Sequence, residues 1–264
     1  MSYWADVHTH SVFSSDGHDA MDVMAKGAVQ AGLSALCVTD HFDTWSSFDP
    51  ELHRVAFEAV RAVVSDRLTF LRGVELGEGH TLGARAETLL LAGGPLDFVL
   101  GSCHCIHDKS DFYDMPRMDR TECLTLIAEY LEELLAMIRW GRFDVLGHLT
   151  YPLRYMVGRD GIAVDFAPFH DVLRALFRAL IEGGHGLEVN VSNLRRPGGF
   201  PMPDLPLLKL YRACGGEIVT VGSDAHRARE IGAYIREGCA LLREAGFKRV
   251  AVYENRRPVW HPLP

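Results

Sequence analysis

The stretch Asp6–His10, D-V-H-T-H, closes a short predicted strand near the start of the chain. A second run, Ala35–His41, ends in a similar way, on T-D-H. Runs of this kind recur along the chain, and longer segments with helical periodicity separate them, which is typical of a parallel α/β architecture. We therefore predict an α/β fold in which polar residues stand where the strands end.

This alternation extends over the whole chain. The predicted strands are Tyr3–His8, Ala35–His41, Leu68–Leu76, Asp97–His104, Asp144–Leu149, Leu187–Val191, Glu217–Asp224 and Arg249–Tyr253. The predicted helices are Ala20–Ala31, Pro50–Val64, Thr121–Trp140, Phe169–Ile181, Leu205–Ala213 and Arg229–Ala245. The stretches Ile106–Met118 and Leu194–Pro203 are rich in proline, glycine and charge, which indicates long loops. No repeat or long linker divides the sequence, so we predict one domain over residues 1–264.

Composition and charge narrow the class of protein. The chain has 264 residues, of which 48% are hydrophobic and 23% charged, as in a soluble globular protein. It has no apolar run of the roughly 18 residues that a membrane span requires and no basic leader, so we expect no membrane partner and a cytoplasmic location. The formal net charge of −8 argues against long nucleic acid as a partner. The six cysteines match no disulfide framework, and we expect reduced thiols.

Polar side chains of the kind that bind metals close seven consecutive predicted strands. In chain order they are Asp6, His8, His10, Asp16, His18, Asp40, His41, Glu75, His104, His148, Glu188, Asn190, Asp224 and His226. In a (β/α) barrel the active site lies at the carboxyl ends of the strands. Any one of these residues alone is as well explained by a core histidine or a loop cap, but seven strand ends together indicate one site.

His8 and His10 form a pair of potential metal ligands, because side chains two residues apart in a strand point to the same side. Imidazole and carboxylate ligands suit zinc, iron or manganese. A shared carboxylate such as Glu75 can bridge two ions. The available ligands are too many for one tetrahedral ion, so we expect a cluster of two or three divalent metal ions.

Taken in order, the motifs D-V-H-T-H, D-G-H, T-D-H, G-V-E, G-S-C-H, G-H-L-T and S-D-A-H resemble those of the polymerase and histidinol phosphatase (PHP) superfamily across nearly the whole chain. The segments Glu188–Arg195 and Phe247–Pro258 are most similar to the histidinol-phosphate phosphatases of that superfamily. The resemblance implies a distorted (β/α)7 TIM-like barrel with a trinuclear metal centre. It also implies hydrolysis of L-histidinol phosphate, a small phosphorylated substrate, in histidine biosynthesis, without a covalent enzyme intermediate.

The resemblance further implies three ligand sets. The first ion would take His8, His10, Glu75 and Asp224, the second Glu75, His104 and His148, and the third Asp16, His41 and His226. Either Asp16 or His18 would complete the third set. Asp6 and Asp40 are expected to orient nearby imidazoles or to cap strand ends. The family's aspartate after the fifth-strand Gly-His is Thr150 here, which leaves the substrate contacts of that loop open.

For the reaction, we expect a metal-bridged hydroxide to attack phosphorus. The catalytic residues would be Glu75, Asp224 and His226, with Asp224, His226 or a metal-bound water giving a proton to the leaving alkoxide. Arg195, and after it Arg154, are the expected substrate-binding residues. Both follow strand ends, and a guanidinium binds phosphate through two parallel hydrogen bonds.

Three other interpretations stay open. Amidohydrolases also begin with His-x-His but often use a carboxylated lysine at a strand end, and none of Lys26, Lys109, Lys209 and Lys248 is so placed. A PHP phosphoesterase could instead act on a nucleotide, a sugar phosphate or a nucleic-acid end. The third alternative is a non-catalytic module, against which the complete ligand set argues.

Overall fold

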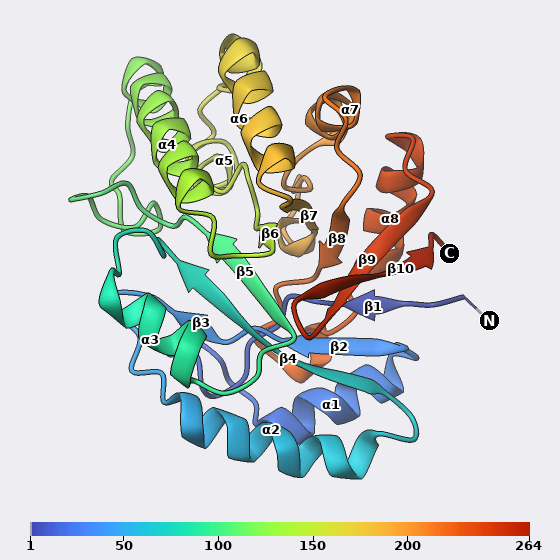
Figure 1. The fold of residues 1–264 in the computed structure, drawn as a ribbon. Coiled ribbons are helices and arrows are strands. Elements are labelled where there is room, and N and C mark those ends of the chain that lie inside the picture. Colours follow the sequence, from blue (N-terminus) through green and yellow to red (C-terminus); the bar gives the residue numbers. More distant parts are fainter. Residues whose placement is uncertain (1) are drawn as a thin grey trace.

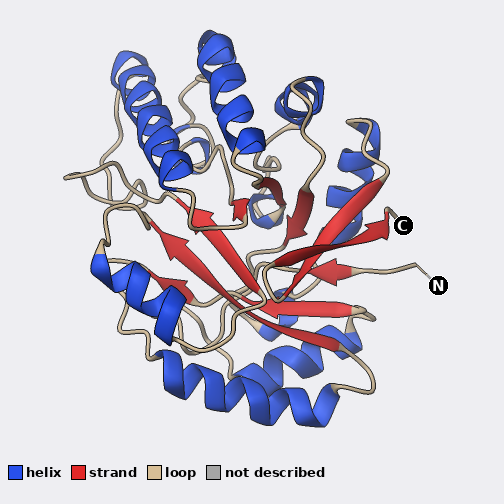
Figure 2. Ribbon diagram, viewed as in Figure 1, coloured by secondary structure: helices blue, strands red, loops and turns tan. Residues whose placement is uncertain are grey.

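The computed structural model describes residues 2–264 and has strands at its centre with helices around them (Figure 1, Figure 2). The strands are β1 (Ala5–Asp6), β2 (Ala35–Val38), β3 (His41–Phe42), β4 (Thr69–Gly77), β5 (Phe98–Ser102), β6 (Val145–Leu146), β7 (Gly186–Asn190), β8 (Val219–Gly222), β9 (Arg249–Glu254) and β10 (Arg257–Pro262). The helices are α1 (Met21–Gln30), α2 (Pro50–Val64), α3 (Ala84–Ala92), α4 (Arg120–Trp140), α5 (Leu153–Met156), α6 (His170–Glu182), α7 (Leu205–Ala213) and α8 (Ile235–Glu244). Short 3-10 turns cover Ala167–Phe169, Ser192–Arg195 and Ala228–Glu230.

The central sheet is parallel and nearly closed. Its strands follow the order β1-β2-β4-β5-β6-β7-β8, and β3 extends the pairing with β4. The two ends of the sheet meet where the amide of Val7 donates to the carbonyl of Val221 at 3.3 Å and the amide of Asp224 donates to the carbonyl of His8 at 2.8 Å. The predicted α/β barrel is therefore confirmed.

Alternation along the strands separates an outer apolar layer from a polar centre. In β4, Arg72, Val74 and Leu76 face the helices, whereas Gly73 and Glu75 face the barrel interior, because successive side chains point to opposite faces. Helix ends are fixed locally as well. Helix α4 begins with a capping box at Asp119 and ends at Gly141, which adopts the left-handed conformation with φ 67°.

The predicted strand Arg249–Tyr253 is a strand, but it lies outside the barrel. As β9 it pairs antiparallel with β10 in a separate hairpin. Its buried residues Ala251, Val252 and Tyr253 pack against Val7 and Leu71 of the barrel interior. In Figure 1 the hairpin lies near the amino end of β1, so it covers the end of the barrel away from the polar residues.

Helix α8 begins at Ile235, later than the predicted Arg229. Tyr234 takes a left-handed conformation with φ 62°, which interrupts the helical path before it. The segments α3, α5 and β10 lie outside the sequence predictions, and β3 overlaps the predicted strand Ala35–His41 only at His41. None of the helices in residues 2–264 has both the length and the apolar character needed to cross a bilayer.

Candidate metal centre

Glu75, at the interior end of β4, is the centre of the site. Its carboxylate oxygens lie within 3.4 Å of ring nitrogens on His8, His10, His41, His104 and His148. Only 1% of the side chain is exposed. Burial disfavours its ionised form, yet the positive charge available on His8, His41 and His104 holds the pKa of Glu75 well below its usual range. Glu75 is therefore an ionised carboxylate that faces imidazole nitrogens on several sides.

The members of the first predicted ligand set lie together. Nε2 of His8 lies 3.1 Å from Nε2 of His10 and 3.4 Å from Oε2 of Glu75. Oδ1 of Asp224 lies 3.4 Å from Nε2 of His10 and 3.7 Å from that of His8. Bonds of about 2.0–2.1 Å to a tetrahedral zinc ion would separate neighbouring ligand atoms by roughly 3.3 Å. The observed spacings fit one such ion.

The second predicted set surrounds the other oxygen of Glu75. Oε1 of Glu75 lies 2.9 Å from Nε2 of His148 and 3.3 Å from Nε2 of His104. His104 follows β5 and His148 follows β6, so two neighbouring strands place the two rings side by side, with centroids 5.0 Å apart. The two oxygens of Glu75 thus face two different groups of imidazoles, as a bridging carboxylate requires.

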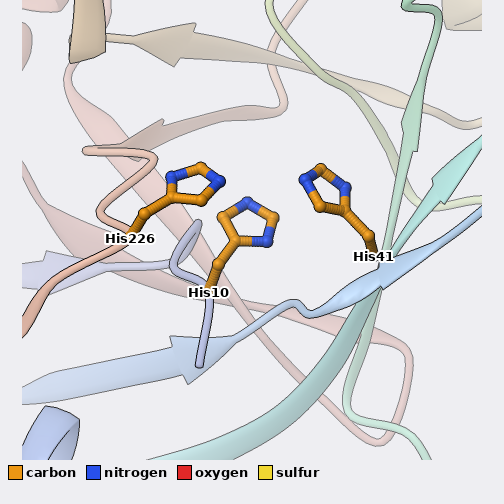
Figure 3. Close-up of side chains that lie close together, drawn as sticks. All are labelled: His10, His41 and His226. Carbon is orange, nitrogen blue, oxygen red and sulfur yellow. The ribbon is translucent and has the colours of Figure 1, made fainter. Parts of the chain in front are cut away.

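The third predicted set also lies together. Asp16 is 3.6 Å from Nε2 of His41 and 3.1 Å from Nε2 of His226. The ring of His10 stacks at 4.2 Å, centroid to centroid, on both His41 and His226, and Figure 3 shows the three rings directed toward one another. His18 instead contacts Nη2 of Arg227 at 2.9 Å. The geometry favours Asp16 over His18 for this set.

Several polar atoms of the site are buried without a well-aligned hydrogen bond. Within the described residues these are His41 Nδ1, Glu75 Oε2, His148 Nδ1 and His226 Nε2, although His41 Nδ1 lies 2.9 Å from Glu75 Oε2 and His226 Nε2 lies 3.1 Å from Asp16. Burying a polar group without a hydrogen bond is costly, so buried groups left unpaired require another partner. Imidazole nitrogens and carboxylate oxygens are the ligands that zinc, iron and manganese prefer. The residues present therefore fit a cluster of divalent ions.

Glu188 is a member of the site to which the sequence assigned no role. Its Oε1 accepts from Nδ1 of His8 at 2.7 Å, and its Oε2 accepts from the backbone amide of His148 at 2.8 Å. The side chains of His8 and Glu188 are both fully buried. A carboxylate that accepts the second ring N–H of a metal-binding histidine fixes its tautomer and direction. The two-residue spacing of Glu188 and Asn190, which puts both inside the barrel, could have indicated this role.

Asp6 and Asp40 each realise one of the two predicted alternatives. Asp6 accepts from the amide and hydroxyl of Ser223 and from the amide of Gly232, so it caps the loop after β8. Asp40 accepts from Ser11, Ser14 and His53. It reaches a predicted ligand only indirectly, because Ser14 Oγ lies 3.1 Å from Nδ1 of His10.

The backbone at the end of β8 aims Asp224 at the site. Asp224 adopts φ 54°, a conformation that is uncommon for a residue other than glycine. Its carbonyl oxygen accepts from Arg195 at 3.0 Å, and the carbonyl of Ser223 accepts from the same guanidinium at 2.6 Å. Burial disfavours the ionised carboxyl, but His8, His10 and Arg154 hold the pKa of Asp224 well below its usual range.

The two predicted substrate-binding arginines have different surroundings. Arg195 donates to backbone carbonyls after β8, as described above, and so anchors that loop. Arg154, on α5, donates from Nη2 to Oδ2 of Asp224 at 3.1 Å and to Ser192, and its guanidinium lies over the ring of Tyr151. Arg154 therefore contacts the side chain of a predicted ligand, whereas Arg195 contacts only backbone carbonyls.

Comparison with known proteins gives relatives over almost the whole chain. The probable histidinol-phosphatase of Thermotoga maritima is 28% identical over 248 residues, 94% of each chain. The histidinol-phosphatase of Lactococcus lactis is 26% identical over 263 residues, 96% of this chain and 95% of the relative.

Solved structures and a family match agree with these relatives. The crystal structure of Lactococcus lactis histidinol phosphate phosphatase, in complex with zinc, L-histidinol and phosphate, superimposes with a TM-score of 0.86 at 24% identity, covering 98% of this chain and 100% of that one. This likeness establishes a shared fold. The family model described as the PHP domain matches residues 6–192, well over half of the sequence. The chain belongs to the PHP domain family.

Proposed function

We propose that this protein is a metal-dependent phosphomonoesterase that hydrolyses L-histidinol phosphate to L-histidinol and phosphate. The observation that carries the proposal is the convergence of histidines and carboxylates on Glu75 at the strand ends, with Arg154 beside Asp224. Two relatives, named probable histidinol-phosphatase and histidinol-phosphatase, are similar to this chain over 94% and 96% of its length, which supports the choice of substrate.

The proposed metal-binding residues are those of the three predicted sets. They are His8, His10, Asp16, His41, Glu75, His104, His148, Asp224 and His226. Two or three divalent ions held there would make water a nucleophile near neutral pH and offset charge on the phosphoryl oxygens. The task of the protein side chains is then to hold these groups in place and to bind the ester.

Binding of the phosphoryl group is assigned first to Arg154. Its side chain is only 14% exposed and its guanidinium already faces a carboxylate, so little side-chain freedom is lost when it binds an anion. Arg195 supports the site by holding the peptide that carries Asp224. Proton transfer to the leaving oxygen is assigned to His226 or to a water bound in the site, which Asp224, kept ionised by its low pKa, would orient. Nδ1 of His226 lies 3.0 Å from the carbonyl of Asp224, which leaves its Nε2 directed toward the site.

The surroundings of Asp111 favour an alcohol with a cationic group. Asp111 is half-buried and accepts from the hydroxyl of Tyr151 at 3.2 Å, and the Tyr151 ring lies 5.0 Å, centroid to centroid, from both His104 and His148. The Tyr151 ring is itself buried and covered by Arg154, so an imidazolium or ammonium group next to the phosphoryl group would contact the carboxylate of Asp111 rather than this ring. Asp111 belongs to the predicted loop Ile106–Met118.

The amidohydrolase alternative receives no support from the site. Glu75 stands between two groups of imidazoles, where it would take the bridging role that a carboxylated lysine often has in that class. We further propose that the partners are small phosphorylated molecules rather than long nucleic acid, in accord with the formal net charge of −8, and that the protein is cytoplasmic.

Phosphate release with a panel of substrates tests the proposed function. Protein reconstituted with zinc, manganese or iron is given L-histidinol phosphate, AMP, a sugar phosphate and p-nitrophenyl phosphate, with a Glu75→Ala variant as blank. We expect kcat/KM for L-histidinol phosphate to exceed the others by about a hundredfold or more, a difference of roughly 2.7 kcal/mol in transition-state binding. Equal turnover of the other esters would overturn the assignment of L-histidinol phosphate as the substrate. The absence of any metal-dependent phosphate release would overturn the proposed activity.

A further inference from the structure

His53 is a fully buried histidine on the outside of the barrel, in a helix that contributes no predicted ligand. It belongs to α2, which in Figure 1 packs along the outer side of the sheet, and its side chain is 0% exposed. The rings of Phe13 and Phe48 lie 5.2 and 4.9 Å from it, centroid to centroid. The imidazole is nevertheless polar on both edges, and each nitrogen has a charged partner.

Arg72 fixes one edge of this imidazole. It stands on the outer face of β4, is 1% exposed, and donates from Nε to Nδ1 of His53 at 3.1 Å. The rest of its guanidinium donates to the carbonyls of Pro50, Gly93 and Pro95 at 2.7 to 3.1 Å. An arginine held by this many acceptors cannot turn away. Because Nδ1 of His53 accepts from Arg72, the ring proton must be on Nε2.

The other edge of His53 faces Asp40. Nε2 of His53 donates to Oδ2 of Asp40 at 3.1 Å. Asp40 is fully buried and also accepts from the amide and hydroxyl of Ser11 and from the hydroxyl of Ser14. The carboxylate is thereby fixed in one orientation between the helical layer and the loop after β1.

Ser14 connects Asp40 to two histidines of the site. While it donates to Asp40 at 2.8 Å, its oxygen accepts from the amide of His41 at 3.0 Å and lies 3.1 Å from Nδ1 of His10. Nδ1 of His10 is therefore the donor, and its Nε2 is left to face His8, Glu75 and Asp224. Figure 3 shows His10 and His41, the two residues that Ser14 contacts, with their rings turned toward each other.

We propose that His53 is a positioning residue of the metal centre. Through Asp40 and Ser14 it sets the tautomer and direction of His10, with Arg72 holding His53 in turn. The inference rests on the proposed role of His10 as a metal ligand. Loss of an outer partner of a metal-binding histidine typically lowers metal affinity or activity by about 10–100-fold. Because two residues, Asp40 and Ser14, stand between His53 and His10, we expect the lower end of this range, a loss of metal affinity of roughly tenfold.

Two variants of His53 separate positioning from packing. In His53→Gln the side-chain amide can reach the place of Nε2 and donate to Asp40. In His53→Asn the amide ends near the place of Nδ1, so it can meet Arg72 but not Asp40. Phe57→Leu, in the same helix and also buried, is the control for a loss of packing without a change in this chain of hydrogen bonds.

The readouts are the zinc dissociation constant, from competition with a chromophoric chelator, and the visible spectrum of the cobalt-substituted protein, alongside thermal stability. We expect His53→Asn to weaken zinc binding about tenfold and to change the cobalt spectrum. His53→Gln and Phe57→Leu should leave both close to those of the original protein. His10→Ala serves as the reference for loss of the ligand itself.

The positioning role would be overturned if His53→Asn kept the original zinc affinity and cobalt spectrum while His10→Ala lost metal. That result would leave the proposed function intact. Equal weakening by His53→Asn and Phe57→Leu would also overturn the positioning role, since stability alone would then explain the effect. If the original protein bound no zinc, the proposed metal centre itself would fail, which is a separate result.

Discussion

At the scale of single residues, Glu75 determines what the site can do. A carboxylate buried among histidines is stable only as part of a charged network, because an unpaired buried charge is costly. Each of its oxygens is directed to a different group of rings. Burying the Glu75 carboxylate without positive charge beside it would cost free energy. With two cations beside it, the same buried carboxylate is suited to bridge them.

Replacing Glu75 by glutamine tests this role with little change of shape. Glu75→Gln keeps the volume but removes the charge that the surrounding imidazoles and ions require. We expect metal content to fall by at least one ion per chain and kcat/KM to fall by more than about a hundredfold, beyond the usual cost of losing an outer partner. Elemental analysis and steady-state kinetics measure both. Full metal content with activity within tenfold of the original would contradict the bridging role.

Residue type and position after a strand are local properties, so the sequence could place ligand-type residues at one face of a barrel. The grouping of His8, His10, Glu75 and Asp224 came from the resemblance to the PHP superfamily, and the structure places these four side chains together. Their orienting partners could not be predicted in this way. Glu188 is 180 residues from His8, and His53 reaches His10 only through Asp40 and Ser14. Such pairs depend on the register of distant strands.

At the scale of elements, the close approach of β8 to β1 and β7 allows His8 and Glu188 to meet. Gly222 lies at this contact. A Cβ atom added there would stand 2.3 Å from both Oε1 of Glu188 and Cβ of His8. No side chain fits, so only glycine permits the His8–Glu188 hydrogen bond at this point.

Gly222→Ala should therefore damage stability and metal binding together. Overpacking of a tight site commonly costs about 1–3 kcal/mol, and here the displaced groups are His8 and Glu188. We expect the free energy of unfolding, measured by urea denaturation, to fall by an amount in that range and the urea midpoint to fall with it, together with weaker zinc retention during dialysis. An alanine variant with unchanged urea midpoint and zinc content would show that the contact is not as tight as the geometry indicates.

The elements that the sequence did not predict have local reasons. Helix α3 is flanked by Gly83 and Gly93, and its leucine-rich segment lacks a clear apolar stripe. The hairpin of β9 and β10 turns at Asn255 and Arg256, with φ 51° and 63°, without the glycine that usually marks such a turn. Strand β3 has two residues, too few for any periodicity.

At the scale of the whole molecule, the last part of the chain completes the site. The family match ends at residue 192, yet β8 pairs with β7 and Asp224 and His226 follow β8. The hairpin of β9 and β10 then packs into the barrel interior. The predicted single domain over residues 1–264 should accordingly unfold as one unit, with the metal ions bound to the folded form alone.

Thermal unfolding with and without chelator tests this. We expect one cooperative transition, whose midpoint temperature falls by several degrees when metal is removed. The reason is that a ligand at about 1,000 times its Kd stabilises the folded state by roughly 4 kcal/mol. The shift should shrink in Glu75→Gln. Two separate transitions would contradict the single domain, and a transition insensitive to chelator would contradict metal binding.

The most direct test of the metal centre is an anomalous difference map, collected above the zinc edge from crystals of the zinc-loaded protein soaked in phosphate. The account predicts two or three peaks within about 2.0–2.3 Å of the ligand atoms around Glu75, with phosphate against Arg154. A map without a peak at Glu75, or with peaks only elsewhere on the protein, would contradict it.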